Sequence, residues 1–150
     1  MLNRLDLISY AMDFSSYIIR NTEKVDKIIL HGSVARGDFD KDSDIDIFID
    51  TLDKKAEKII KKIEENFYKT DNYKKWKLKG EINKISLIIG KLDSEEWKDL
   101  KRAIISTGIL LYGKYNSNIQ KMKNYVLFVF ENIKPESKRV FIHRKLFNCL

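Results

Sequence analysis

The chain is poor in the residues that cross-link or interrupt a fold. Its 150 residues include one cysteine, one proline and six glycines. Because Cys149 stands alone, neither an intrachain disulfide nor a cysteine-based metal site can form within one chain. The low proline and glycine content, with 43% hydrophobic and 34% charged residues, indicates a compact globular protein rather than a disordered one.

Long hydrophobic runs are absent as well. The apolar runs lie at residues 28–30, 85–89, 109–112 and 125–130, and each is far shorter than the ~20 residues needed to cross a bilayer. We therefore expect neither a membrane span nor a signal peptide, and a cytoplasmic location. A chain of this length suits one domain, or one domain with a small C-terminal addition.

Positive charge is in excess, and the excess grows toward the C-terminus. Lys and Arg number 29 against 22 Asp and Glu, which gives a formal net charge of +7. This balance favours contact with polyanions, either a nucleoside triphosphate or a nucleic acid. An ordinary solvated helix face is the simpler interpretation for one group of lysines: Lys54, Lys55, Lys58, Lys61 and Lys62.

The most informative stretch is an apolar segment that ends in HGSVARGD at residues 31–38. The apolar residues predict a buried strand, and Gly32 and Ser33 predict the sharp turn that leaves it. A glycine lets backbone amides approach a phosphate closely, and the hydroxyl of Ser33 can join them. The pattern predicts a turn that holds the terminal phosphates of a nucleoside triphosphate. His31 is expected to end the strand as a hydrogen-bonded side chain rather than to act as a base or ligand.

Two aspartates, Asp44 and Asp46, stand one residue apart in the next apolar segment, DIDIFI. Alternate side chains of a strand share a face, so the two carboxylates are expected to project together while Ile45 and Ile47 enter the core. A hard divalent cation prefers such oxygen ligands. A solvated acidic turn is a sufficient interpretation for the acids at 38–42. It does not suit Asp46, whose carboxylate would be costly to bury without a partner.

The Gly-Ser turn, a ten-residue spacer and the Asp-x-Asp pair together resemble the signature of the minimal nucleotidyltransferases of the DNA polymerase β superfamily. Arg36, Gly37 and Ser43 also match the common pattern, and ILLYG at 109–113 resembles the ending of many such domains. The resemblance covers roughly residues 1–113. It implies an α/β (α+β) fold, with a small mixed sheet flanked by helices.

The resemblance implies metal-dependent transfer of a nucleoside monophosphate, with Mg²⁺ or Mn²⁺ as cofactor and ATP as the default donor. Asp44 and Asp46 would bind the metal and serve catalysis. Four residues would hold the nucleotide: Gly32, Ser33, Arg36 and Ser43. For Arg36, an ion pair with a nearby acid is an equal alternative.

A third carboxylate from a neighbouring strand is also implied by the resemblance, because it polarises the attacking hydroxyl in this family. Ser86 occupies the expected place in the apolar segment 85–89, and a serine is a weak metal ligand and no general base near neutral pH. Glu81, five residues earlier, could substitute only if the strand begins sooner or the preceding loop folds back over the site. If neither supplies the acid, the chain is a catalytically weak or inactive module that binds nucleotide or nucleic acid.

The acceptor is not identified by the residues themselves. The same core is shared by small antitoxins that transfer AMP to a partner toxin protein, and by enzymes that modify RNA ends or small drugs. Since no separate base-reading domain is visible, transfer of AMP to a partner protein is the leading hypothesis and RNA the alternative acceptor. Exposed aromatic residues in so small a chain also make a homodimer plausible.

Apolar periodicity places the other elements. A first helix is predicted from a stripe of six residues: Leu5, Ile8, Met12, Ser15, Ile18 and Ile19. A second helix carries Ala56, Ile59, Ile60, Ile63 and Phe67, and a strand follows at 84–89. Ser94 is predicted to cap a helix that bears Trp97, Leu100, Ile104 and Ile105 and stops at Gly108. The segment 109–113 predicts a last strand.

Residues 114–150 form a basic, aromatic extension beyond the nucleotidyltransferase domain of 1–113. A helix is slightly favoured over a buried strand for 119–133, and Ser137 is predicted to cap a short terminal helix. Four of its residues could contact a nucleic acid or an acceptor: Lys138, Arg139, Arg144 and Lys145. The simpler interpretation is an amphipathic helix that packs on the same domain, or in a dimer, with a solvated basic edge.

Overall fold

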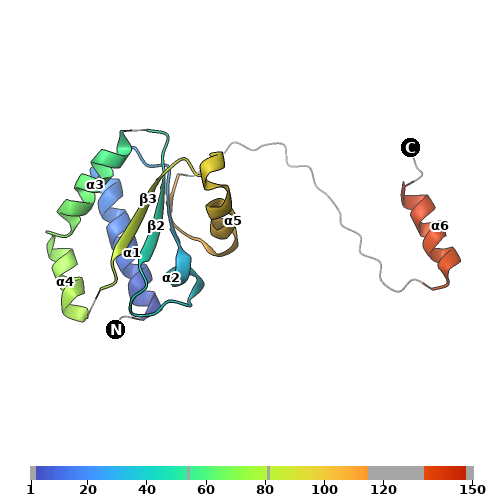
Figure 1. Cartoon of the computed structure of the whole chain (residues 1–150), viewed down its shortest axis with the longest axis horizontal. Helices are drawn as coiled ribbons and strands as arrows, with labels where there is room; N and C mark the ends of the chain where they lie inside the picture. Colours follow the sequence, from blue (N-terminus) through green and yellow to red (C-terminus); the bar gives the residue numbers. More distant parts are fainter. Residues whose placement is uncertain (1–2, 54, 81, 115–133, 148–150) are drawn as a thin grey trace. The chain divides into compact units, whose positions relative to one another are not determined.

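The computed structural model describes residues 3–53, 55–80, 82–114 and 134–147, apart from the side chains of residues 143, 146 and 147. The chain divides into two compact units, Met1–Tyr115 and Asn116–Leu150, and each is considered by itself (Figure 1). Among the described residues, no helix is long and apolar enough to cross a membrane.

The described strands of the first unit form a mixed sheet in the order β3-β2-β1-β4. The central strand β1 (Lys27–His31) is antiparallel to both β2 (Ile45–Asp50) and β4 (Ile109–Gly113). The edge strand β3 (Ile85–Gly90) is parallel to β2. A parallel pair needs a long crossover, which two helices provide between β2 and β3. The predicted small mixed sheet is confirmed.

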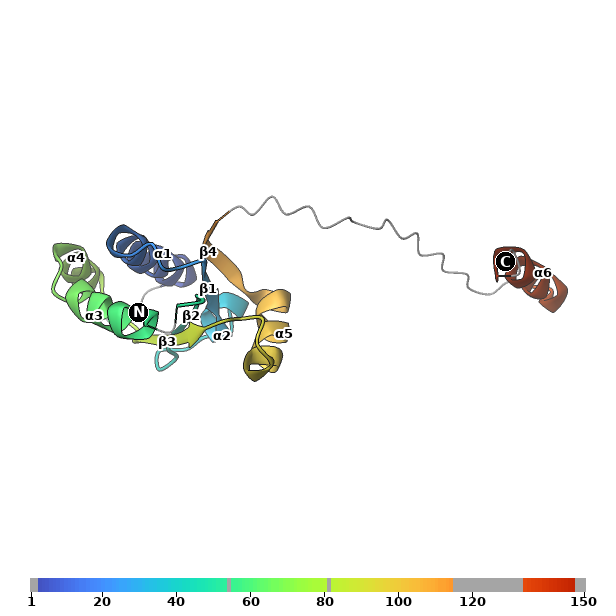
Figure 2. The ribbon, with the colours of Figure 1, turned by 90° about the horizontal axis from the view of Figure 1, so that it is seen from above.

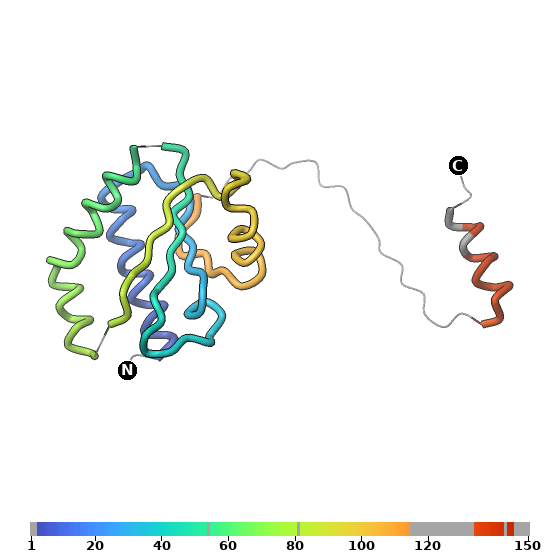
Figure 3. The backbone as a smooth tube through the Cα atoms, viewed as in Figure 1, coloured from blue at the N-terminus to red at the C-terminus, as the bar shows by residue number. Residues whose placement is uncertain are grey.

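Helices cover both faces of this sheet (Figure 2). One face carries α1 (Arg4–Asn21), α3 (Ala56–Phe67) and α4 (Asp71–Lys79), and the other carries α2 (Gly32–Arg36) and α5 (Lys98–Thr107). The 3-10 turn η1 (Glu95–Trp97) leads into α5. The tube in Figure 3 shows the crossover running from β2 through α3 and α4 into β3.

The main core lies between the sheet and the α1, α3 and α4 layer. It takes alternate residues of the two central strands: Ile28, Leu30, Ile45, Ile47 and Ile49. Aromatic rings fill the helical side, and the ring centroid of Phe67 lies 5.0 Å from that of Phe14 and 5.9 Å from that of Tyr10. A second, smaller cluster lies under α5 and consists of Ile29, Phe48, Leu92 and Ile104.

The first helix forms where its spacing predicts, and most of its predicted stripe packs as expected: Ser15 and Ile18 are buried, and Ile8 and Ile19 pack against the core. Its buried residues are Leu7, Tyr10, Ala11, Phe14, Ser15 and Ile18. Leu5 and Met12, which were predicted to face the core, are 73% and 52% exposed. Apolar residues surround most of this helix, so more than one three-to-four spacing fits the sequence. The rings of Tyr10 and Phe14 decide the face because aromatic side chains bury the most apolar area.

The helix α4 was not predicted from the sequence. Among its nine residues only Trp76 is buried, so no apolar stripe in the sequence predicts this helix. It begins at a cap that the sequence does contain, because the Thr70 hydroxyl accepts a hydrogen bond from the Tyr73 amide at 3.2 Å. The indole of Trp76 joins α4 to α1, since its Nε1 donates to the Asp13 carboxylate at 2.7 Å.

The predicted caps of the next helix are only partly right. Ser94 stands at the N-cap of η1, but its side chain makes no capping hydrogen bond. Gly108 does follow α5, yet its backbone is extended, with φ −67°, rather than left-handed. Ile105 is 75% exposed, whereas Ile104 is buried. The helix therefore lies where it was predicted, with a narrower apolar face.

In the second unit the structure describes one helix, α6 (Glu136–Phe147). It begins at Glu136, so Ser137 lies inside its first turn and does not cap it, which corrects that prediction. Val140 and Phe141 are exposed on this helix, at 40% and 61%. The segment predicted as helix or strand at 119–133 lies outside the described residues, as does Cys149.

Candidate active site

The predicted phosphate-binding turn lies where β1 ends and α2 begins. Gly32, the first residue of α2, has φ +71°, a left-handed value that favours glycine. A Cβ atom at this position would lie 2.1 Å from Oδ2 of Asp46. Glycine is therefore required twice, for its backbone angle and for the close approach of the Asp46 carboxylate to the backbone of the turn.

The two predicted metal ligands flank the first residue of β2: Asp44 comes just before Ile45, and Asp46 follows it. Asp46 is half-buried, and its neighbours Ile45 and Ile47 point into the main core on the other face of the sheet. Asp44 is exposed and lies one residue before the strand begins. The sequence prediction that Ile45 and Ile47 enter the core is thus confirmed.

Three side chains occupy successive strands at this end of the sheet. The register pairs His31 of β1 with Asp46 of β2, and Asp46 with Ser86 of β3. Ser86 thus stands directly beside Asp46, at the strand position where the family resemblance implies a third carboxylate. Its half-buried hydroxyl takes the place of an acid there.

His31 is buried at the end of β1, and its Nε2 atom has no hydrogen-bond partner among the described residues. The expectation of a hydrogen-bonded side chain is therefore wrong for this nitrogen. Burial lowers the pKa of His31 below its ordinary value, and the Asp46 charge opposes that effect. The imidazole is consequently neutral near pH 7.

No further acid joins the pair in the part of the chain that the structure describes. Glu81, the predicted substitute, lies outside the described residues. Two acids elsewhere in the first unit, Asp71 and Asp93, are engaged in ion pairs, with Lys74 at 2.9 Å and with Lys101 at 2.7 Å. Across the described ranges, no cluster of three or more His, Cys, Asp or Glu could hold a metal ion.

The two carboxylates still fit one divalent cation by their chemistry. Mg²⁺ and Mn²⁺ prefer hard oxygen ligands, and Mg²⁺ is commonly held by one or two carboxylates together with substrate phosphates. Asp46 supplies a half-buried carboxylate against the backbone of the Gly32 turn, and Asp44 supplies an exposed one. The donor set suits a cation that arrives with a triphosphate rather than a closed protein cage.

Arg36 and Ser43, the other predicted nucleotide contacts, are engaged within the protein. Arg36 Nε lies 3.2 Å from the Asp38 carboxylate, so the ion-pair alternative is the one that the structure contains. The hydroxyl of Ser43 donates to Asp40 Oδ1 at 2.8 Å and accepts from the Asp40 amide at 2.9 Å. The hydrogen bond from the Ser43 hydroxyl, together with one from the Asp42 amide at 3.0 Å, lowers the pKa of the Asp40 carboxyl. The two hydrogen bonds of Ser43 close the turn ahead of Asp44.

Two residues that the sequence did not single out hold the site in place. The buried amide of Asn83 donates to the carbonyls of Asp40, Lys41 and Ser43, at 3.4, 3.2 and 2.6 Å. Arg4 donates through Nε to the Val34 carbonyl at 3.0 Å, and through Nη2 to that of Ala35. Asn83 fixes the loop before Asp44, and Arg4 fixes the end of α2. An asparagine just before a strand was the only available signal.

The basic residues predicted to contact an acceptor, Lys138, Arg139, Arg144 and Lys145, all lie exposed on α6. Arg139 pairs with Glu136, and Lys145 Nζ lies 5.9 Å from the centroid of the Phe141 ring. They belong to the second unit.

A hollow of about 220 Å³ lies between α1 and the junction of α3 and α4, rather than at the aspartates. Its lining includes Asp13, Tyr17 and Arg20 of α1, and Phe67 and Thr70 at the end of α3. It shares no residue with the turn at Gly32 or with the row from His31 to Ser86.

Comparison with known proteins relates this arrangement to a family. A model described as Polymerase beta, Nucleotidyltransferase matches residues 16–117, which include the whole sheet and both aspartates. No curated protein matches the chain by sequence. A crystal structure of a toxin-antitoxin with AMP-PNP is 23% identical, with a TM-score of 0.42. A crystal structure of a mutant of the toxin-antitoxin MntA-HpeT is 20% identical, with a TM-score of 0.43. Each comparison covers 75% of this chain and 75% of the other. The family match spans more than half of the chain, so the protein belongs to the polymerase β nucleotidyltransferase family.

Proposed function

We propose that this protein is a metal-dependent nucleotidyltransferase that transfers AMP from ATP to a hydroxyl group of a macromolecular acceptor. One observation carries the proposal: the Asp46 carboxylate lies against the backbone of the Gly32 turn, where a Cβ would come within 2.1 Å of it. This contact joins the carboxylate to the phosphate-binding turn. It supports a site in which one cation and one triphosphate are held together.

The residues of the turn would bind and orient the donor. Backbone amides at Gly32 and Ser33, with the Ser33 hydroxyl, would hold the terminal phosphates. Asp44 and Asp46 would hold Mg²⁺ or Mn²⁺, which when bound neutralises the triphosphate and stabilises the leaving pyrophosphate. Asn83 and Arg4 act as positioning residues, since they hold the two loops that carry the aspartates and the turn.

In the transfer, the acceptor hydroxyl would give up its proton to solvent, or to Glu81 if that acid completes the site, and its oxygen would form a bond to the α-phosphorus. The bond from that phosphorus to the oxygen that bridges to the β-phosphate would break, and pyrophosphate would leave. The chain would contribute mainly position and charge, as in other phosphoryl transfers. Beside Asp46 stands Ser86, whose hydroxyl cannot serve as a strong base. We therefore expect slow transfer unless another acid, such as Glu81, completes the site.

A second candidate function is favoured by that same pairing of Asp46 with Ser86. Without a third carboxylate, the fold could bind a nucleotide and its cation and yet not transfer it. Such a protein would act as a nucleotide-binding or nucleic-acid-binding module. The two candidates share the turn and the aspartates, so they differ only in whether a nucleotide becomes covalently attached to an acceptor.

The test is incubation of the full chain with Mg²⁺ or Mn²⁺ and each α-labelled triphosphate, with protein and RNA acceptors present. We expect label to appear with ATP and a divalent cation, and to disappear in Asp46→Asn. The matched control is Asp42→Asn, which makes the same chemical change on an exposed residue of the same acidic stretch. Absence of label from every acceptor, with nucleotide binding retained, would favour the binding module.

A further substitution, Ser86→Asp, separates slow transfer from none. A correctly placed general base contributes about 10²–10⁴-fold to a proton transfer. If the chain is a slow enzyme that lacks its third acid, Ser86→Asp should raise the rate at least tenfold with little change in nucleotide affinity. A rate that falls instead would indicate that the natural site is already complete. Ser106→Asp, an exposed position on α5, controls for added charge.

A further inference from the structure

Most buried polar side chains of the first unit have hydrogen-bond partners, and His31 is an exception. Five polar residues are buried in the part of the chain that the structure describes, and four of them make side-chain hydrogen bonds: Ser15, Asp50, Thr51 and Asn83. His31 is only 7% exposed, yet its Nε2 atom has no partner among the described residues. Burial without a partner costs stability, so this nitrogen needs an explanation beyond packing.

The imidazole lies on the same face of the sheet as the Asp46 carboxylate. Along β1, Ile28 and Leu30 enter the main core, so Ile29 and His31 occupy the opposite face. Asp46 occupies that face of β2, because its two neighbours in sequence enter the main core. The register makes His31 and Asp46 direct neighbours. Opposed residues of an antiparallel pair have Cβ atoms roughly 4.5–5.5 Å apart, so side-chain rotation can bring an imidazole N–H to the carboxylate.

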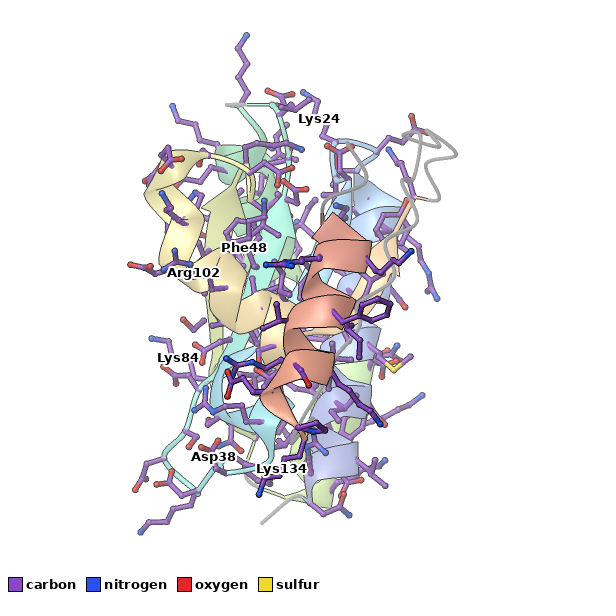
Figure 4. All side chains as sticks on the ribbon, turned by 90° about the vertical axis from the view of Figure 1, so that its right-hand side faces the viewer. Lys24, Asp38, Phe48, Lys84, Arg102 and Lys134 are labelled. Atoms are coloured by element: carbon purple, nitrogen blue, oxygen red, sulfur yellow. The ribbon has the colours of Figure 1, made fainter. Side chains whose placement is uncertain are left out.

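This pair of side chains lies at the end of the sheet that carries the phosphate-binding turn. Phe48, on the same face of β2, lies between Lys24 and Lys84 along the first unit (Figure 4). The Lys84 carbonyl accepts the Ile45 amide at 2.7 Å, so β2 begins at the Lys84 end. Asp46 therefore lies one step nearer to that end than Phe48, and the residue after His31 is the first residue of the turn.

The Asp46 carboxylate lacks donors in the same way that His31 lacks an acceptor. Asp46 is half-buried, and no described residue donates a hydrogen bond to its oxygens or forms an ion pair with them. Asp50, on the same face of the same strand, accepts from the Leu92 amide at 3.0 Å and lies 3.5 Å from Lys91 Nζ. A carboxylate that ligates a metal is normally hydrogen-bonded as well. His31 is the neighbour on β1 that can supply this hydrogen bond.

We propose that His31 is a positioning residue of the cation site, and that its imidazole donates a hydrogen bond to the Asp46 carboxylate when a divalent cation is bound. This inference rests on the cation site of the proposed function. An imidazole carries an N–H in either protonation state, so the role does not depend on titration. The unpaired ring and the unpaired carboxylate would satisfy each other in the loaded site, and this gain would add to the affinity for the cation.

The test measures the affinity of the full chain for an ATP analogue with a methylene bridge between the α- and β-phosphates, which cannot be transferred. Calorimetric titrations are made with Mn²⁺ and, separately, in EDTA. His31→Phe keeps an aromatic ring and removes both nitrogens. It should weaken binding of the Mn²⁺ complex about 10–100-fold, the usual loss when the hydrogen-bond partner of a metal ligand is removed. Binding in EDTA should not change, because His31 acts through the cation site.

Two variants separate positioning from packing. His31→Gln retains an amide N–H and should keep most of the affinity for the Mn²⁺ complex. Ile29→Val, a buried change on the same face of the same strand, should leave that affinity unchanged. Because His31→Phe removes an unpaired buried nitrogen, its midpoint in urea should not fall. His31→Leu, a smaller apolar replacement, serves if phenylalanine does not fit. Affinity that falls only in step with stability would assign His31 to packing and overturn the proposal.

Asp46→Asn keeps this inference separate from the proposed function. It should reduce the affinity for the Mn²⁺ complex, and adding His31→Phe should cause no further loss, since the two residues act as a pair. Additive losses would overturn the pairing. Weaker binding of the analogue in EDTA would assign the imidazole to a phosphate oxygen instead. Affinity that depends on Asp46 but not on His31 would overturn this inference and leave the proposed function standing. Affinity unchanged by Asp46→Asn would remove the cation site and both proposals.

Discussion

At the scale of single residues, Gly32 links the backbone of the turn to the chemistry of Asp46. The position combines a φ of +71° with a carboxylate oxygen 2.1 Å from where a Cβ would stand. Gly37, five residues further on, has a φ of +93°, but the nearest atom to its Cβ position is Arg4 Nε at 3.4 Å. The two glycines therefore share a backbone requirement and differ in steric contact.

We expect Gly32→Ala to lower the free energy of unfolding more than Gly37→Ala does. A left-handed alanine costs roughly 1–2 kcal/mol at either position, and only Gly32→Ala must also displace Asp46. Urea unfolding of both variants measures the difference, and nucleotide affinity should fall in Gly32→Ala alone. The double variant Gly32→Ala, Asp46→Ala should recover part of the extra loss. Equal destabilisation at both positions would show that the contact with Asp46 carries no energy.

His31 provides a pH prediction. Its pKa in the folded chain lies below the ordinary value of 6.5, chiefly because the imidazole is buried. The unfolded chain therefore binds more protons as the pH falls below about 6.5. The contribution of His31 to stability is complete above that pH and is lost as the pH falls through the window beneath it. Urea unfolding without divalent cations, between about pH 7.5 and 5, should show this decline.

The matched variant is His31→Gln, which should flatten the decline. Because the Asp46 charge raises the pKa of His31, Asp46→Asn should make the decline steeper. A pH profile unchanged by His31→Gln would contradict the assignment.

The sequence predicts the residues of the site better than it predicts the residues that hold them in place. The Gly-Ser turn and the aspartate pair are recognisable because their spacing is fixed by a turn and a strand. The place of Ser86 beside Asp46 follows from strand alternation. Asn83 and Arg4 could not be found in this way, since each reaches residues some 30 to 43 positions away and no local pattern marks such a contact. The roles of the site residues stay predictions.

At the scale of elements, the loop before β2 is held by β3 through Asn83. Its amide nitrogen reaches three carbonyls, and the backbone adds the bond from Ile45 to Lys84 at 2.7 Å. We expect Asn83→Ala to lower stability by about 1–3 kcal/mol, because three partly buried hydrogen bonds to carbonyls lose their donor. Nucleotide affinity should also fall, since Asp44 lies at the end of this loop.

Asn83→Asp should be at least as damaging, because a carboxylate cannot donate to carbonyls. Asn66→Ala, an exposed position near the end of α3, is the control and should change neither property. Calorimetric titration with MgATP and urea unfolding provide both measurements. Loss of stability without loss of nucleotide affinity would show that the loop need not be fixed for binding.

The elements that the sequence predicted well are those with one apolar face. β1, β2, β3, β4 and α3 lie where alternation or three-to-four spacing placed them. α1 has apolar residues on more than one side, so its buried face was predicted only in part: Leu5 and Met12 lie exposed. α4 has a single buried residue among lysines, so tertiary packing of Trp76 rather than a sequence pattern accounts for it.

At the scale of the whole molecule, charge is distributed unevenly between segments. Residues 114–150 contain eight basic and two acidic residues, and residues 69–84 contain six and two. The remainder of the chain is slightly acidic. The net charge of +7 therefore comes from two segments rather than from a uniform basic surface. We expect these two segments to account for the salt dependence of any binding to polyanions.

The first unit contains its own core. All residues of both buried clusters lie between Leu7 and Ile104, ahead of the last strand. We therefore expect a chain that ends at residue 115 to fold and to unfold cooperatively in urea. A second expectation follows from the prediction that the extension packs on the domain. Unfolding would then expose more surface, and the m-value rises with the surface exposed. The full chain should then show both a higher midpoint and a larger m-value than the shortened one. Equal values would contradict packing of the extension, and a shortened chain that fails to unfold cooperatively would contradict the independence of the first unit.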